Sequence, residues 1–339
     1  MEKILIIQTA FIGDAILTLP MIQKLKDLYP KSIIDVLAIS STREIFSASP
    51  FVNEVIIVDK QKKHKSYISL LKFSKGLKVK NYSRVYSPHR SFRSALIVFN
   101  LSAKESYGFS TSSFKNVYKN LIFYSNANHE VQRNLDLIGY KYDDNSWRIQ
   151  PEVEIPQRVQ QKVKEFYSKV SGSEFIAIAP GSIWNTKKYP IYYYEELIKI
   201  LKEKFIIILI GSENEKEICN EIALKFGNDV ISTAGEFSLL ESIEILKKTK
   251  LLVSNDSAPT HLGMCAGIPV LTLFCSTIPG FGFYPYSEKS SYLSYDDIPC
   301  KPCGLHGRKK CPIKTFACGL ELTPKIVITK IEEMLNACD

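Results

Sequence analysis

The sequence predicts an α/β protein with two domains, each containing a parallel sheet. Short apolar runs that suit buried strands alternate with longer segments that have helical periodicity. This alternation stops in a polar stretch near residues 143–156 and then starts again. The chain of 339 residues is also long enough for two domains. We therefore expect a first domain over residues 1–155 and a second over residues 156–339.

Four apolar runs in the first half are expected to form strands. They cover residues 4–7, 33–38, 55–58 and 84–86. The run at 4–7 is cut by Gln8 and no clear small-residue cleavage site follows, so it indicates a buried strand rather than a signal peptide. Residues 15–28 carry apolar side chains on one helical face and predict the first helix.

Five further runs are the expected strands of the second half. They cover residues 175–179, 205–210, 229–232, 251–254 and 270–274. Residues 192–204 and 239–248 have helical patterns between these runs. Strands that alternate with helices form parallel sheets through right-handed crossovers, and open α/β sheets bind ligands beyond the carboxyl ends of their strands. The loops that follow the strands are therefore where we look for a site.

The charge of the chain is unevenly distributed. There are 44 basic and 35 acidic side chains, for a net charge of +9. Residues 1–150 hold 22 basic and 12 acidic side chains, whereas the rest hold 22 and 23. From Lys60 to Lys119, 14 basic residues accompany a single acid, Glu105. The first half therefore suits an anionic partner, such as a phosphorylated lipid, a membrane face or nucleic acid.

Composition excludes several classes of protein. The hydrophobic share of 45% and the charged share of 23% are those of a globular chain, not of a disordered or fibrous one. No apolar run reaches the roughly 18–20 residues of a membrane span. Eight cysteines are too few for a disulfide scaffold of this length, so we expect a reducing cytoplasm.

The loop after the first strand contains Gly13 and Asp14. A dinucleotide-binding loop needs three glycines at this place, so Gly13 alone disfavours a nicotinamide-dependent dehydrogenase. Asp14 stands where the first helix is expected to start. That position suits a carboxylate that interacts with the helix dipole, and the alternative is a general base in a ligand site.

Two loops of the second half carry groups that suit a nucleotide. Residues 180–190 offer hydroxyls, backbone N–H groups and the ammonium groups of Lys187 and Lys188. These groups suit a phosphate, although a solvated turn before a helix has the same composition. Glu213 follows the strand at 205–210, where an acid can accept hydrogen bonds from a ribose diol.

Residues 254–263 are the most informative stretch. A strand runs into an Asn-Asp-Ser sequence, and a proline falls in the first turn of the helix expected to follow. Asp256 or Ser257 is the expected N-cap, and the free N–H groups of that turn would point at an anion. Capping accounts for these two residues but not for Thr260 and His261 on the same turn.

Four of the eight cysteines fall within one short segment without clear periodicity. They are Cys300, Cys303, Cys311 and Cys318. The Cys-x-x-Cys spacing of the first two is that of a metal knuckle, and four thiolates can close a tetrahedral site for a structural Zn²⁺ or iron ion. The alternative is a set of reduced or partly buried thiols, since a reducing compartment disfavours disulfides.

These segments together resemble glycosyltransferase family 9, the bacterial heptosyltransferases of lipopolysaccharide core assembly. The matching pieces are residues 12–14 with 17–20, 180–181 with 187–190, 211–213, 254–257 with His261, and 267–270. They follow the family's order and span nearly the whole chain. The resemblance implies the GT-B architecture, in which two Rossmann-like domains with parallel sheets face a central cleft. It also implies that the last helix, residues 323–339, packs back toward the first domain.

The resemblance assigns roles to individual residues. Asp14 matches the catalytic base. Lys187 matches a lysine on the donor diphosphate, Glu213 a ribose-binding acid and Asp256 an acid near the sugar. The full set of implied donor-binding residues is Ser182, Lys187, Glu213, Asp256, Ser257, Ala258, Thr260 and His261. Three residues depart from the family pattern, namely Ala258 for a common Gly, Thr260 for a Met or Ser and Tyr189 for a frequent Trp.

The implied reaction is transfer of a heptose from ADP-heptose to a lipid-linked core sugar, with inversion at the anomeric carbon. Lys187 and the helix N-terminus at Ser257 would stabilise the departing ADP, so catalysis requires no metal or other cofactor. The basic first half would bind the anionic lipopolysaccharide acceptor, with peripheral contact to the cytoplasmic membrane face. Arg90 and Arg93 are the candidates there, and solvated surface arginines are the alternative.

Two other functions remain open at this stage. One is a GT-B glycosyltransferase that uses a different nucleotide sugar or acceptor. The other is a metal-containing nucleic-acid-binding protein that uses the four cysteines together with the basic segment. The second leaves the polar loops at the strand ends unexplained, so we expect no nucleic-acid partner.

Overall fold

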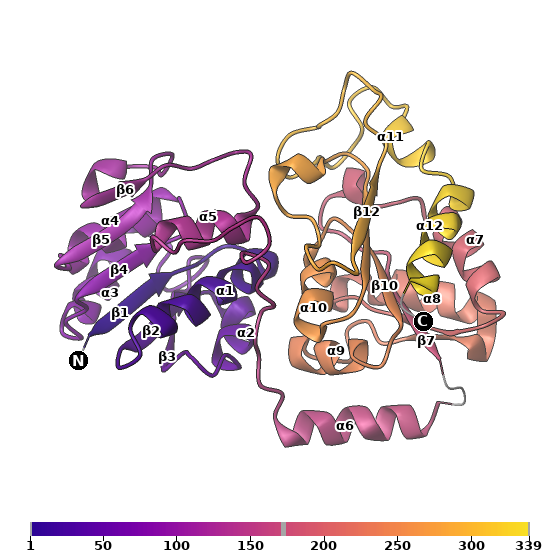
Figure 1. Cartoon of the computed structure of the whole chain (residues 1–339), viewed down its shortest axis with the longest axis horizontal. Coiled ribbons are helices and arrows are strands. Elements are labelled where there is room, and N and C mark those ends of the chain that lie inside the picture. Colours follow the sequence, from indigo (N-terminus) through magenta and orange to yellow (C-terminus); the bar gives the residue numbers. More distant parts are fainter. Residues whose placement is uncertain (1, 171–173, 338–339) are drawn as a thin grey trace. The chain divides into compact units, whose positions relative to one another are not determined.

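The chain folds into two α/β units, Met1–Glu154 and Ile155–Asp339, in a computed structural model that describes residues 2–170 and 174–337 (Figure 1). This boundary lies one residue before the expected one. Each unit contains a six-stranded sheet in which all the pairs are parallel. The predicted fold class of parallel α/β domains is therefore confirmed.

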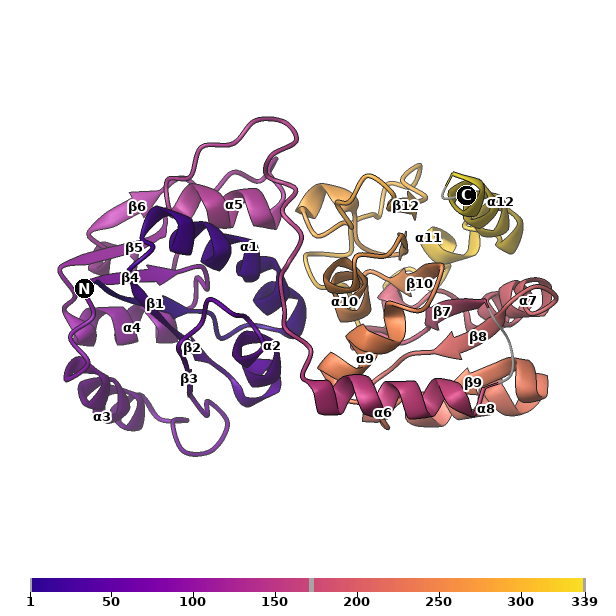
Figure 2. The ribbon, with the colours of Figure 1, turned by 60° about the horizontal axis from the view of Figure 1, so that its bottom comes forward.

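The first unit is built on strands in the order β3-β2-β1-β4-β5-β6. Its strands are β1 (Lys3–Ile7), β2 (Ile33–Ala38), β3 (Glu54–Ile57), β4 (Arg84–Ser87), β5 (Glu105–Phe109) and β6 (Asn120–Ile122). Its helices are α1 (Ile12–Leu28), α2 (Arg43–Ser47), α3 (Tyr67–Lys78), α4 (Phe92–Leu101) and α5 (Glu130–Leu137). Helices α1 and α5 cover one face of this sheet, whereas α3 and α4 cover the other (Figure 2).

The second unit has the strand order β12-β11-β10-β7-β8-β9. Its strands are β7 (Phe175–Ala179), β8 (Ile206–Leu209), β9 (Val230–Ser232), β10 (Leu251–Asn255), β11 (Val270–Phe274) and β12 (Ser291–Ser294). Its helices are α6 (Gln157–Ser168), α7 (Ile191–Leu201), α8 (Lys216–Phe226), α9 (Leu239–Leu246), α10 (Ala258–Ala266), α11 (Ala317–Leu320) and α12 (Pro324–Asn336).

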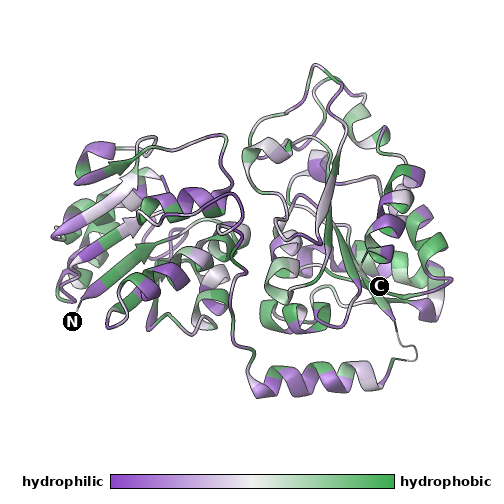
Figure 3. Ribbon diagram, in the orientation of Figure 1, coloured by the Kyte–Doolittle hydropathy of each residue, from purple (hydrophilic) through white to green (hydrophobic). Residues whose placement is uncertain are grey.

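Apolar side chains gather in the central strands of each sheet (Figure 3). Every residue of β7, β10 and β11 is buried, and so are four of the five residues of β1. Helices on both faces exclude water from these strands, which is why they read as continuous apolar runs. The register is fixed by neighbours on both sides, since Ile6 pairs with Val36 in β2 and with Tyr86 in β4.

The final helix uses its apolar side chains within the second unit. Val327, Ile331 and Met334 of α12 are buried in the core cluster of that unit, and α12 packs against α7. The expected packing of this helix toward the first domain stays a prediction, and its last two residues lie outside the described part. Among the residues described, no helix combines the length and the hydropathy that a membrane crossing needs.

Candidate active site

Asp14 lies in the first turn of α1, directly beyond the carboxyl end of β1. The helix begins at Ile12, three residues earlier than expected, so Asp14 is inside it. The Phe11 backbone N–H donates to Asp14 Oδ2 over 3.2 Å, and Thr18 Oγ1 donates to the Asp14 carbonyl over 2.7 Å. A carboxylate in the first turn is favoured by the helix dipole. Asp14 is half-buried, so the fold holds this carboxylate in place without sealing it from a ligand.

A second carboxylate, Glu130 at the start of α5, lies near Asp14. Arg133 Nη1 donates to Glu130 Oε2 over 3.0 Å, and the Tyr124 hydroxyl donates to the same oxygen over 3.3 Å. Burial and the Asp14 charge raise the pKa of Glu130. Glu130 cannot be singled out from the sequence, because Glu130 and Arg133, three residues apart, look like any ion pair on the surface of a helix. Only the packing of α5 on α1 shows that the pair is buried beside Asp14.

Arg90 and Arg93 have different surroundings. The Arg90 guanidinium carbon lies 3.9 Å from the ring centroid of Tyr124, and the Arg90 charge acts on Glu130. Arg93 instead donates to the backbone carbonyls of His64 and Lys65. The structure therefore brings Arg90, but not Arg93, into the neighbourhood of Asp14 and Glu130.

Three polar side chains meet beyond β1 and β4. Lys60 Nζ donates to the Thr9 carbonyl over 2.5 Å, and Thr9 Oγ1 is 2.8 Å from His89 Nδ1. Burial, together with the charge of Lys60, lowers the pKa of His89 to about 4. This cluster was missed from the sequence because its members are separated by up to 80 residues.

In the second unit, Lys187 and Asp256 form a close ion pair. Lys187 ends the short 3-10 turn η3 (Asn185–Lys187), and Asp256 lies between β10 and α10. Lys187 Nζ is 2.6 Å from Asp256 Oδ2, and the two side chains are 14% and 10% exposed. Thr277 Oγ1 also donates to Asp256 Oδ2, over 2.7 Å. Two residues predicted to bind the donor are thus brought together.

His261 on α10 adds a neutral imidazole to this region. Burial lowers the pKa of His261 to about 4, although the Asp256 charge opposes this shift. Its Nδ1 is buried and has no hydrogen-bond partner among the described residues. Such a nitrogen calls for a partner, and a ligand is one way to supply it. The hydroxyl of Thr260, the residue before His261, donates to the Asn255 carbonyl over 3.2 Å. This hydroxyl therefore supports the packing of α10 on β10.

Asn255 joins the loops that follow β7 and β10. Its Nδ2 donates to the Pro180 carbonyl over 2.8 Å, and its Oδ1 accepts from the Tyr189 N–H over 2.9 Å and from the Tyr194 hydroxyl over 3.0 Å. Asn255 is fully buried. In the sequence Asn255 is visible only as part of a motif, yet this side chain fixes the loop that leads to Lys187.

The other predicted donor residues occupy neighbouring loops. Ser257 is the N-cap of α10, which starts at Ala258. Ser182 is buried in the loop after β7, whereas Glu213 is exposed in the loop after β8. These loops follow adjacent strands of one parallel sheet, so they lie along the same edge. Their contacts with a donor stay predictions.

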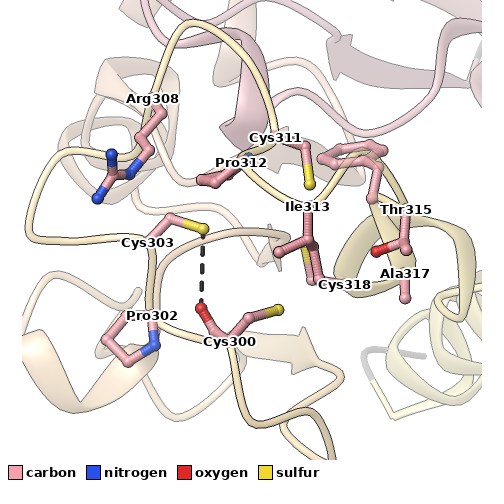
Figure 4. A pocket seen from close by; sticks show the side chains of 11 residues that line it. Cys300, Pro302, Cys303, Arg308, Cys311, Pro312, Ile313, Thr315, Ala317 and Cys318 are labelled. Carbon is pink, nitrogen blue, oxygen red and sulfur yellow. Dashed lines mark hydrogen bonds between the residues drawn. The ribbon is translucent and has the colours of Figure 1, made fainter.

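The four cysteines of the segment 300–318, which we call the cysteine-rich segment, line a cavity of about 200 Å³ (Figure 4). All four are free thiols. Partial burial raises the pKa of the Cys311 thiol, but backbone N–H groups of residues 313–316 aim at its sulfur and the net effect lowers that pKa. In the described part of the chain, no three His, Cys, Asp or Glu side chains are placed to hold a metal ion. This arrangement does not support the predicted metal site.

Comparison with known proteins identifies a matching family and relatives of similar length. A sequence model of glycosyltransferase family 9 (heptosyltransferase) matches residues 70–314. Lipopolysaccharide heptosyltransferase 2 of Salmonella typhimurium is 25% identical and aligns over 86% of this chain and 87% of its own length. Lipooligosaccharide heptosyltransferase 2 of Campylobacter jejuni is 23% identical over 98% of this chain and 99% of its own.

Solved structures show the same fold over the full length. E. coli ADP-heptose lps heptosyltransferase II superposes with a TM-score of 0.80 at 23% identity and covers 99% of both chains. A glycosyl transferase family 9 protein from Veillonella parvula gives a TM-score of 0.85 at 20% identity over 99% of this chain and 98% of its own. The predicted GT-B fold is thus confirmed. Because the family match covers well over half of the sequence, the chain belongs to glycosyltransferase family 9 (heptosyltransferase).

Proposed function

We propose that this protein transfers a heptose from ADP-heptose to the inner core of lipopolysaccharide, with inversion at the anomeric carbon. The names of the relatives support this donor and this acceptor. The observation that carries the proposal is the Lys187–Asp256 pair beside the N-terminus of α10. A lysine and a helix N-terminus at one sheet edge are the groups that a nucleoside diphosphate requires.

On the donor side, Lys187 and the first N–H groups of α10 bind the diphosphate. When the bond between the anomeric carbon and the diphosphate breaks, negative charge grows on the departing ADP. A fixed ammonium and a helix N-terminus stabilise that charge without reorganising. Asp256, held by Thr277, neutralises Lys187 before the donor arrives and then accepts hydrogen bonds from sugar hydroxyls. Glu213 binds the ribose, and no cofactor enters the reaction.

On the acceptor side, Asp14 acts as the general base. The acceptor hydroxyl oxygen attacks the anomeric carbon, its proton passes to an Asp14 carboxylate oxygen, and ADP leaves from the opposite face of the sugar. The Phe11 N–H holds one Asp14 oxygen in place. Glu130 is buried close to Asp14, and burial together with the Asp14 charge raises the pKa of Glu130.

The basic segment of the first unit, residues 60–119, binds the anionic acceptor at the cytoplasmic side of the membrane. We assign Arg90 to an acceptor phosphate or carboxylate, because it belongs to the neighbourhood of Asp14. Exposed aromatic rings accompany the basic residues, since Tyr67, Phe92 and Phe114 follow one another at centroid distances of 5.6 and 5.7 Å. An aromatic cluster in a positive field suits the interface of an anionic leaflet. This membrane contact is peripheral.

The test is ADP release from ADP-heptose with a deacylated core acceptor, compared with a panel of other nucleotide sugars. We expect release with ADP-heptose only, and only when the acceptor is present. Faster release from another nucleotide sugar would show that the protein is a GT-B enzyme with a different donor. Release with ADP-heptose but with an unrelated acceptor would overturn the lipopolysaccharide assignment alone.

A further inference from the structure

The cysteine-rich segment closes over the turn that carries Lys187. The Thr186 N–H donates to the Arg308 carbonyl over 3.1 Å. The Arg308 N–H donates back to Thr186 Oγ1 over 2.8 Å, and Ser276 Oγ donates to the same hydroxyl over 2.9 Å. Thr186 Oγ1 itself donates to the Arg308 carbonyl over 3.1 Å. A hydroxyl has one donor and two acceptor positions, so the buried Thr186 hydroxyl is fully used.

Three more contacts hold the same two stretches together. Asn185 Nδ2 donates to the Lys309 carbonyl over 3.1 Å. The rings of Trp184 and His306 stack with 16° between their planes. Gly307 has φ +78°, and a Cβ built on it would lie 3.0 Å from Lys187 Cγ. The backbone of the cysteine-rich segment therefore lies directly against the aliphatic stem of Lys187, where a side chain would push that stem aside.

The partner of Lys187 is tied to the same network. The Cys303 N–H donates to the Ser276 carbonyl over 2.8 Å. Ser276 precedes Thr277, whose hydroxyl holds Asp256. Both Ser276 and Thr277 are fully buried. Hydrogen bonds thus connect the cysteine-rich segment to Thr186, which precedes Lys187 in the chain. They also connect it to Ser276, which precedes the residue that holds Asp256.

We propose that Thr186 and Gly307 are positioning residues for the donor diphosphate, and that the cysteine-rich segment is part of the donor-binding apparatus. Neither residue touches the donor in this scheme. They fix the stem and the backbone of Lys187, so that its ammonium is already placed when the diphosphate arrives. This inference rests on the proposed role of Lys187.

The test compares Thr186→Val with Thr186→Ser. Valine keeps the shape of the side chain and removes its hydroxyl, whereas serine keeps the hydroxyl. We expect Thr186→Val to raise the dissociation constant of ADP and the KM for the donor about tenfold, with the acceptor KM unchanged. Thr186→Ser should stay within about twofold of the parent. Calorimetric ADP binding gives a readout that does not depend on turnover.

Thr249→Val is the matched control, because Thr249 is another buried threonine of this unit whose hydroxyl donates to a backbone carbonyl, that of Leu246. It should leave ADP affinity unchanged even where the melting temperature falls. If Thr186→Val fails to fold, Gly307→Ala takes its place, with the same donor-specific loss. Unchanged ADP affinity in the folded variants, or equal losses for donor and acceptor, would overturn the inference.

Lys187→Ala separates this inference from the proposed function. If Lys187→Ala weakens ADP binding and Thr186→Val does not, the positioning role is wrong and the donor site stands. If Lys187→Ala leaves ADP binding unchanged, the assignment of Lys187 is itself wrong.

Discussion

Lys187 Nζ lies 2.6 Å from Asp256 Oδ2, and both side chains are nearly buried. The two residues are 69 positions apart in the chain. A buried ion pair gains little stability over apolar side chains of the same volume, whereas removal of one partner leaves the other charge unpaired. A pair of this kind is better explained by a ligand that competes for one of the charges. The proposed donor diphosphate would be such a ligand for Lys187.

Lys187→Ala should weaken the donor side of the reaction. A charge-assisted contact contributes about 1.5–3 kcal/mol, so ADP affinity should fall roughly ten- to a hundredfold. Isothermal titration with ADP measures this directly. Lys188→Ala is the matched control, since Lys188 is the next lysine in the same loop, and its loss should have a much smaller effect. A reversal of the two results would place Lys188 on the diphosphate instead.

Asp14→Asn should abolish transfer while the protein stays folded. Asparagine keeps the size of the side chain and an oxygen that can accept from the Phe11 N–H, but it cannot take a proton. Loss of a general base lowers the rate by about 10²–10⁴-fold. Single-turnover assays with saturating donor measure this, and circular dichroism verifies the fold. Near-native turnover in this variant would remove Asp14 from the mechanism.

The acceptor KM should rise with salt, because exposed charges are screened within about 8 Å at physiological ionic strength. Arg90→Ala should raise the acceptor KM and leave ADP affinity unchanged. Arg93→Ala is the comparison, since Arg93 binds backbone carbonyls and its loss should lower stability more than acceptor affinity. An acceptor KM that does not change with salt or with Arg90→Ala would show that the basic side chains of residues 60–119 are solvated and do not bind the acceptor.

Acid should destabilise the protein through His261. The unfolded imidazole titrates near 6.5, whereas burial lowers the pKa of folded His261 to about 4. Between pH 6.5 and 4 the unfolded chain therefore binds a proton that the folded chain does not. The contribution of His261 to the free energy of unfolding is complete above pH 6.5 and is lost as the pH falls toward 4. Between pH 7 and 5 the loss is about 2 kcal/mol. His89, with a similar pKa, acts in the same direction in the first unit.

Urea denaturation of His261→Gln at the two pH values checks this. The variant should lose less stability on acidification than the parent. Equal losses in the two proteins would show that His261 does not contribute to the pH dependence.

Alkylation should reach Cys311 before the buried thiols. Backbone N–H groups overcome burial and lower the pKa of Cys311, so more of it is thiolate at neutral pH. Burial raises the pKa of Cys265 and of Cys219 to about 12. Peptide mass spectrometry after brief iodoacetamide treatment gives the order. Elemental analysis of the same protein, purified without a metal-binding tag, tests the metal hypothesis for the four cysteines. A full equivalent of a transition metal together with protected thiols would show that the four sulfurs close on an ion, and less than a tenth of an equivalent would reject that hypothesis.

The central strands could be predicted from the sequence because burial on both faces leaves a continuous apolar run. Strands β5, β6 and β12 were missed for the opposite reason. The strand β5 contains Ser106 and Gly108, β6 has three residues, and β12 lies at a sheet edge with no fully buried residue. Propensity and period say little about such short polar pieces, and their pairing is decided by the rest of the sheet.

The residues of the candidate site also fall into two groups, those that a local sequence pattern predicts and those that only tertiary packing brings together. Asp14 lies in the first turn of the helix after β1, and Lys187 and Asp256 lie in the segments that follow β7 and β10, so their positions follow from the local pattern. The role of Glu130 depends on how α5 packs on α1. The contact of Thr186 with Arg308 joins segments that are 122 residues apart, so no local sequence pattern predicts it.

The two sheets have the same strand order when each is counted from its own first strand, namely 3-2-1-4-5-6. The loops after the first and fourth strands therefore occupy equivalent places, with Asp14 and Arg90 in one unit and Ser182 and Asp256 in the other. The two units therefore share one architecture, and in each unit predicted site residues follow the first and the fourth strand. Evolution can then replace the loops of one copy while those of the other, and the core beneath them, are inherited intact. In the proposed scheme, a change of acceptor alters the loops of the first unit and leaves the donor loops of the second unit as they are.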